Sequence, residues 1–250
     1  MTLESLFNLP QYKRGSITFN KNEELIKPFV DNLQSYVKHW EIKAEFPKDS
    51  AVDDEENEVI AASRFIVEGL LNDNYQVSFG NDKHDKVIGL MYALDVQKPV
   101  VKVWQGYLRQ ACTNTQVFNP KHLNIGYLND ENYDTVFNSI PTWLSNLEED
   151  KIKFQEKYRM FTKDVLGNEI YEFIGKLGIQ CQKRGLKSQF ANMLSLLDNT
   201  QSMYYVPNGV KQGLYTRWDL IQQLTDNLKR MDFVNRASNS SQIFSLVESL

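Results

Sequence analysis

The sequence contains few cysteines, glycines and prolines, and each shortage excludes a class of protein. Among 250 residues there are 12 glycines and 7 prolines, too few for a collagen or a low-complexity disordered chain. The two cysteines, Cys112 and Cys181, lie far apart and outside any CxxC pair. We therefore expect neither a structural disulfide nor a cysteine-based zinc site.

Long apolar runs and targeting signals are also missing. The longest apolar runs, such as residues 87–94, fall well short of the roughly 20 residues that cross a bilayer. The first residues include Glu4 and Pro10 and lack the basic region and apolar run of a signal peptide. We expect a cytoplasmic protein with no membrane partner.

The usual catalytic and cofactor motifs are absent. Neither GxxxxGK[ST] nor GxGxxG occurs, so no nucleotide site of the usual type is expected. His39, His84 and His122 have no HxH or HxxxH spacing and predict no metal site. Cys112 and His122 are not accompanied by an oxyanion-hole glycine motif. We predict no catalytic residue, no metal and no cofactor, and an enzyme is the least supported class of function.

Charge limits how the chain could bind nucleic acid. The formal net charge is −4 and the isoelectric point is about 5.5. A protein held to nucleic acid by its overall charge should be basic. Any such binding must therefore come from a local basic patch.

Apolar spacing predicts two helices, then strands, then more helices. Apolar residues recur every three or four positions over 22–40 and again over 59–71, which predicts two helices. Alternation and turn signals then predict an antiparallel meander of three or four strands. The expected strands lie within 75–79, 87–96, 100–104 and 107–118, with a short one at 16–19. Helices are expected over 131–147, 151–165, 169–182, 188–197, around 218–228, and over 242–250.

The resulting fold class is α+β, with an antiparallel β-meander flanked by N-terminal helices and followed by a mostly helical C-terminal half. We expect an irregular N-terminal arm over residues 1–15 and an α+β region over 16–128. A helical region over 129–250 would form one compact unit with the meander.

Basic residues alternate with aromatic ones along the meander. Lys102, Trp104, Tyr107 and Arg109 combine the cations and rings that hold single-stranded nucleic acid. Lys102 and Trp104 share one face of a strand, which is either a binding platform or an ordinary face with Trp104 packed under a helix. A second basic cluster contains Lys183, Arg184 and Lys187. A third contains Lys229, Arg230 and Arg236.

Two short motifs resemble a known family. The segment from Arg109 through Cys112, Asn114 and Thr115 resembles the Arg-x-x-Cys-x-Asn-Thr segment of a phage- and plasmid-encoded family, domain of unknown function 932. Thr216 and Trp218 are similar to the Thr-x-Trp segment that opens a late helix in that family. The chain departs from the family at residues 83–86, which lack the glycine of a Ser-His-Asp-Gly type turn, and at 222–223, where Gln-Gln replaces Asn-Ala.

The resemblance implies a phage or mobile-element protein that acts in DNA metabolism in the host cytoplasm. Our leading hypothesis is a non-enzymatic protein that binds, and in one version anneals, single-stranded DNA as a homo-oligomer. The alternative is a phage accessory protein that binds a host or viral protein in an anti-defence or assembly role.

Overall fold

The structure is a computed structural model that describes most of the chain. The described residues are 1–8, 13–14, 17–18, 22–45, 51–52, 58–59, 64–79, 82–93, 100–109, 115–116, 140–163, 165–166, 170–198, 215–226, 228 and 233–250.

The chain divides into two compact units, each made of three separate segments that alternate along the sequence. Unit 1 consists of Met1–Gln76, Asp85–Gly106 and Lys121–Leu147. Unit 2 consists of Val77–His84, Tyr107–Pro120 and Glu148–Leu250. Two strands, β8 (Asp82–Ala93) and β9 (Val100–Arg109), contribute residues to both. The boundary that we expected at residues 128–129 lies outside the described residues, and the structure assigns parts of the meander to the same unit as the C-terminal helices.

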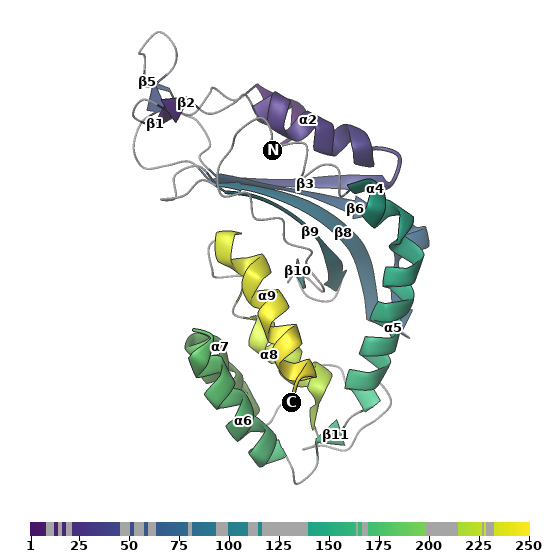
Figure 1. The fold of residues 1–250 in the computed structure, drawn as a ribbon, viewed down its shortest axis with the longest axis vertical. Coiled ribbons are helices and arrows are strands. Elements are labelled where there is room, and N and C mark those ends of the chain that lie inside the picture. Colours follow the sequence, from purple (N-terminus) through teal and green to yellow (C-terminus); the bar gives the residue numbers. More distant parts are fainter. Residues whose placement is uncertain are drawn as a thin grey trace. The chain divides into compact units, whose positions relative to one another are not determined.

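Unit 1 is built on an antiparallel sheet with the strand order β9-β8-β6-β3. Helix α2 (Asn22–Leu33) lies over one face of this sheet, as Figure 1 shows, and shares a core with its inward residues. The N-terminal helix α1 (Leu3–Phe7) and α4 (Ile140–Ser145) add side chains to the same core. The sheet strands are β3 (Val37–Glu45), β6 (Arg64–Leu71), β8 (Asp82–Ala93) and β9 (Val100–Arg109). Shorter elements are β1 (Lys13–Arg14), β2 (Ile17–Thr18), β4 (Ala51–Val52), β5 (Glu58–Val59) and the 3₁₀ turn η1 (Asp73–Tyr75).

Three of our expectations for unit 1 are wrong. The first expected helix ends at Leu33, and residues from Val37 onward form β3, in which polar His39, Glu41 and Lys43 alternate with apolar positions. The second expected helix is the strand β6 over its described part, buried on both faces. The arm is not irregular throughout, because α1 places Leu6 in the core with no exposed surface.

In its described part, unit 2 combines short strand pairs of the meander with the helices of the C-terminal half. Strand β7 (Val77–Phe79) pairs with the start of β8, with Phe79 opposite Asp82. Strand β10 (Thr115–Gln116) pairs with the end of β9, and β11 (Val165–Leu166) pairs with β12 (Tyr215–Thr216). The helices are α5 (Leu147–Lys163), α6 (Ile170–Lys183), α7 (Lys187–Asp198), α8 (Arg217–Asp226) and α9 (Phe233–Glu248).

The helical half agrees with the sequence prediction. Helices α5, α6 and α7 begin and end within four residues of the expected bounds, and α8 covers the expected Trp218 segment. Helix α9 begins at Phe233, well before the expected residue 242. The α+β fold class is confirmed. Within the described part of the chain, no helix is long and apolar enough to cross a membrane.

Candidate nucleic-acid interface

Trp104 is a buried residue of β9 and is not exposed. Its side chain is 2% exposed, on the face of β9 opposite the core residues Val101 and Val103. The indole covers Gly89 of β8 so closely that a Cβ at that position would overlap the ring. A glycine is therefore required beneath the tryptophan, and Trp104 cannot stack on a base in this arrangement.

Tyr107 is equally buried, within unit 2. Its ring stacks on Phe154 of α5 with centroids 4.1 Å apart and an interplanar angle of 9°. Burial raises the pKa of the phenol, and the nearby charges of Asp150 and Glu148 raise it further. The base-stacking role predicted for Trp104 and Tyr107 is wrong, because both rings are core residues. The side chains of Lys102 and Arg109 lie outside the described part of the structure.

Thr216, one of the two described motif residues with a defined side chain, starts helix α8. Its backbone N–H donates to Asp219 Oδ2 at 2.8 Å, and the backbone N–H of Asp219 donates to Thr216 Oγ1 at 3.1 Å. These reciprocal bonds form a capping box, which satisfies helix donors that would otherwise be buried without acceptors. The Thr-x-x-Asp spacing of this cap is visible in the sequence. Cys112 and Asn114 lie outside the described residues, and of Thr115 only the backbone in β10 is described.

The other motif residue, Trp218, packs in an aromatic cluster of unit 2. Its ring lies edge-on to those of His84 and Tyr158, with ring centroids 5.8 Å and 4.7 Å apart, respectively. The Tyr158 hydroxyl donates to buried Asp82 at 3.0 Å, and Phe79 stacks on the Tyr158 ring at 3.6 Å. His84 and Trp218, which come from two segments compared with the family, therefore meet in one cluster. All of these contacts are those of a packed core.

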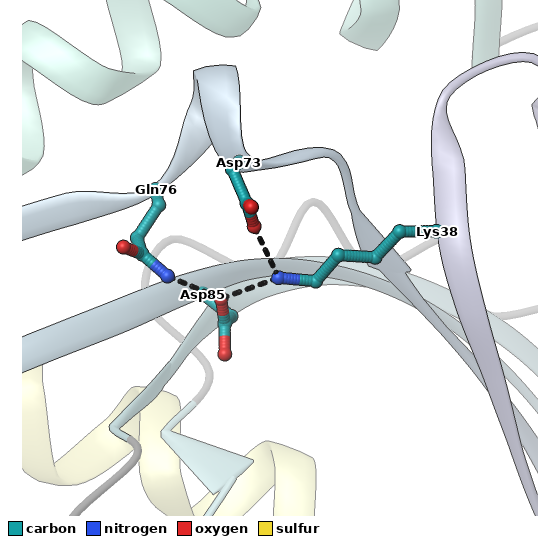
Figure 2. Close-up of polar contacts among 4 residues, drawn as sticks. All are labelled: Lys38, Asp73, Gln76 and Asp85. Carbon is teal, nitrogen blue, oxygen red and sulfur yellow. Dashed lines mark hydrogen bonds and ion pairs between the residues drawn. The ribbon is translucent and has the colours of Figure 1, made fainter.

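Asp85 belongs to a polar cluster of unit 1. Lys38 Nζ donates to Asp85 at 3.0 Å and to Asp73 at 2.7 Å, and Gln76 Nε2 donates to Asp85 at 2.9 Å (Figure 2). Burial alone would lower the pKa of Lys38, but the hydrogen bonds and charges of Asp73 and Asp85 outweigh it and raise that pKa. The cation thus neutralises a carboxylate that is only 5% exposed. This cluster joins the start of β3, η1 and β8, which is a structural role.

The second basic cluster is exposed at the connection between α6 and α7. Gly185 has a φ of +73°, and the N–H of Leu186 donates to the carbonyl of Cys181 at 2.8 Å. This is the Schellman ending of a helix, with Leu186 buried beneath it. The geometry leaves Lys183 and Arg184 exposed on one side of the glycine. Lys187 is exposed on the other.

These three cations, which we call the basic turn (Lys183, Arg184 and Lys187), lie in the most one-sided charge region of α6 and α7. Residues 173–197 contain four Lys or Arg and no Asp or Glu, in a chain with a net charge of −4. None of the three forms an ion pair with another residue of the described ranges. The N-terminus of α7 adds the positive end of a helix dipole at the same place.

The remaining candidate residues form no further binding site in the described part of the chain. Lys229 and Arg230 lie outside the described residues, as does the side chain of Arg236. Burial raises the pKa of Cys181 to about 11, with a smaller opposing effect of Arg184, so this thiol stays protonated near neutral pH. Among the residues that the structure describes, no three His, Cys, Asp or Glu side chains are grouped to hold a metal ion.

No family model, curated protein or solved structure matches this chain. The resemblance to family 932 therefore stays a prediction that rests on the two short motifs.

Proposed function

We propose that this chain binds single-stranded DNA without catalysis, through the basic turn, as part of the DNA metabolism of a phage or mobile element in the host cytoplasm. The observation that supports it is the exposure of Lys183, Arg184 and Lys187 in a stretch of 25 residues that has no acidic side chain. An acidic protein needs such a local patch to approach a phosphate backbone.

The compactness of the basic turn favours a single strand. Its three cations fall within five residues, where α6 ends and α7 begins. A flexible strand can bring neighbouring phosphates together around so small a patch, whereas a duplex holds its phosphates at fixed positions. The binding energy would come from phosphate contacts, so little sequence preference is expected.

The test is fluorescence anisotropy with labelled single- and double-stranded oligonucleotides over a salt series. We expect Lys183→Ala, Arg184→Ala and Lys187→Ala, combined in one variant, to weaken single-strand binding by about tenfold or more at low salt. Loss of three phosphate contacts should also lower the slope of log affinity against log salt by about 2, at about 0.7 per contact.

The matched control removes three cations from another helix. Lys153→Ala, Lys157→Ala and Lys163→Ala on α5 change the net charge by the same amount, and Lys153 and Lys157 are already paired with Glu149 and Glu248. An equal loss in both variants would show that only overall charge matters. Tighter binding to the duplex would overturn the single-strand proposal. An absence of any binding at low salt would overturn the function and favour the protein-binding alternative.

A further inference from the structure

Helix α6 carries an exposed apolar stripe that the proposed function does not use. Tyr171 is 83% exposed and Ile179 is 58% exposed, the two highest values for large apolar side chains in the described part of the chain. Gly175 lies midway, four residues from each. At about 100° per residue, these three positions fall within about 80° of helix surface. They form the α6 stripe, a narrow line of Tyr171, Gly175 and Ile179.

Packing within the described part of the chain does not require a glycine at position 175. Gly175 lies in the interior of a 14-residue helix, where glycine is less favourable than alanine. A Cβ built at Gly175 would meet no heavy atom within 4 Å. The neighbouring Gly178 differs, because its Cβ would stand 2.7 Å from the ring of Phe190 on α7. Gly178 therefore serves packing within unit 2, whereas Gly175 leaves room for a backbone that approaches from outside.

We propose that the α6 stripe binds the α6 stripe of a second copy of this chain, with the two helices antiparallel and Gly175 on the twofold axis. Positions four residues before and four residues after Gly175 lie about 6 Å from the axis in opposite directions. Tyr171 of each copy then lies level with Ile179 of the other. The stripe is thus complementary to itself, as the two identical surfaces of a twofold interface must be.

Charge complementarity supports this occupant. Glu172 and Lys176 follow the same flank of α6 and form an ion pair 2.6 Å long within one chain. In the antiparallel pair, Glu172 of one copy lies about 3 Å along the axis from Lys176 of the other. The rim of the interface then has an acidic residue at each end and the two lysines between them. This row allows each carboxylate to pair with a lysine of either copy.

The stripe is small, which sets the expected strength. Standard protein interfaces bury about 800 Å² per partner, more than one helix face with two large apolar side chains supplies. The dimer should therefore be weak and reversible. Its central contact is the close approach at Gly175, so a bulky side chain such as leucine there should abolish it without harming the isolated chain.

Sedimentation velocity over a concentration series tests the dimer in the absence of nucleic acid. We expect the wild-type mass to rise from one copy towards two between about 1 and 500 µM. Gly175→Leu should remain monomeric, and Tyr171→Ala should weaken the dimer by about tenfold, which corresponds to about 1.4 kcal/mol. Met160→Ala removes a 48% exposed apolar side chain from α5 and should change nothing. A monomeric wild type over this range, or dimers of Gly175→Leu, would overturn the proposal.

Cross-linking tests the position of the twofold axis. A disulfide needs Cα atoms about 4.4–6.8 Å apart, so G175C should link to its own copy under mild oxidation. Q182C places the two cysteines about 21 Å apart along the axis and serves as the matched control. The wild type, with its own two cysteines, sets the background. Equal cross-linking of both variants would refute the antiparallel arrangement. These experiments do not depend on DNA binding, because the triple alanine variant of the basic turn should dimerise as the wild type does.

Discussion

Replacing Lys38 by methionine tests whether the polar cluster of Figure 2 stabilises unit 1. The change removes the charged donor Lys38 from the Asp85 carboxylate and leaves the hydrogen bond from the Gln76 amide in place. Removing one partner of a fully buried ion pair costs about 3–5 kcal/mol, and an exposed pair contributes about 0–1 kcal/mol. The side chains of Lys38 and Asp85 are 31% and 6% exposed, between these limits. We therefore expect a loss of about 2 kcal/mol.

Urea unfolding followed by tryptophan fluorescence measures this loss. Trp40, Trp104 and Trp143 lie in unit 1, so three of the four tryptophans report on the unit that is changed. With a denaturant slope of about 2 kcal/mol per molar, the midpoint should fall by about 1 M. Lys27→Met is the control, because its partner Glu23 and Lys27 itself are about half exposed on α2. If both variants unfold at the same urea concentration, the ion pair between Lys38 and buried Asp85 stabilises the protein no more than the exposed pair on α2 does.

The same pair predicts a dependence on alkaline pH. The folded pKa of Lys38 is raised above its ordinary value, so the folded state binds the proton more tightly than the unfolded state does. The stabilisation is therefore fully present below the unfolded pKa of about 10.4 and is lost as the pH rises through the folded pKa. The stability difference between wild type and Lys38→Met should be constant from neutral to mildly alkaline pH and should shrink only above that value. A difference that already falls near pH 8 would contradict this assignment.

Two further predictions concern the α8 cap and the tryptophan contact. Thr216→Ala should lower the stability of unit 2 by about 1–2 kcal/mol, because it removes the side-chain acceptor of the capping box. Thr216→Ser keeps that acceptor and should retain most of the stability. Thermal unfolding followed by circular dichroism compares the two variants. Gly89→Ala should destabilise unit 1 by about 1–3 kcal/mol, because the added methyl group overlaps the Trp104 ring. If combining it with Trp104→Phe restores the stability, that overlap is the cause. A Gly89→Ala variant as stable as the wild type would refute the prediction.

The C-terminal helices could be predicted because their signals are local. In α6 the buried Phe173, Leu177 and Cys181 recur every four residues, and Gly185 marks the helix end. The cluster of Lys183, Arg184 and Lys187 is likewise local, because its three cations fall within five residues of the sequence.

Strand β6 could not be told from a helix by its spacing. Phe65, Ile66, Val67 and Leu71 are all buried, because the strand is covered on both faces. A run of this kind has apolar residues at helical intervals and at strand intervals alike, so periodicity cannot decide. The pairing with β3 and β8, which does decide, joins residues far apart in the sequence.

Trp104 shows a similar limit at the candidate site. Strand alternation places Lys102 and Trp104 on one face and Val101 and Val103 on the other, and the structure puts Trp104 opposite those two core valines. Alternation does not say whether the second face is exposed. Burial of the tryptophan depends on Gly89 of the neighbouring strand, a long-range contact that no local pattern encodes.

The distribution of charge links the two proposals without making either depend on the other. Residues 173–197 carry a formal charge of +4, so the rest of the chain carries −8 against a total of −4. Under the proposed function, a phosphate backbone would be repelled by most of this protein and attracted to α6 and α7, where the basic turn lies. In the antiparallel pair the two Lys183 positions lie about 24 Å apart along the helix axis. One strand that reaches both turns would bind the second at a high effective concentration, which offsets the weakness of a three-cation patch. A weak dimer and a small patch, each insufficient for tight binding alone, would then strengthen one another on the same nucleic acid.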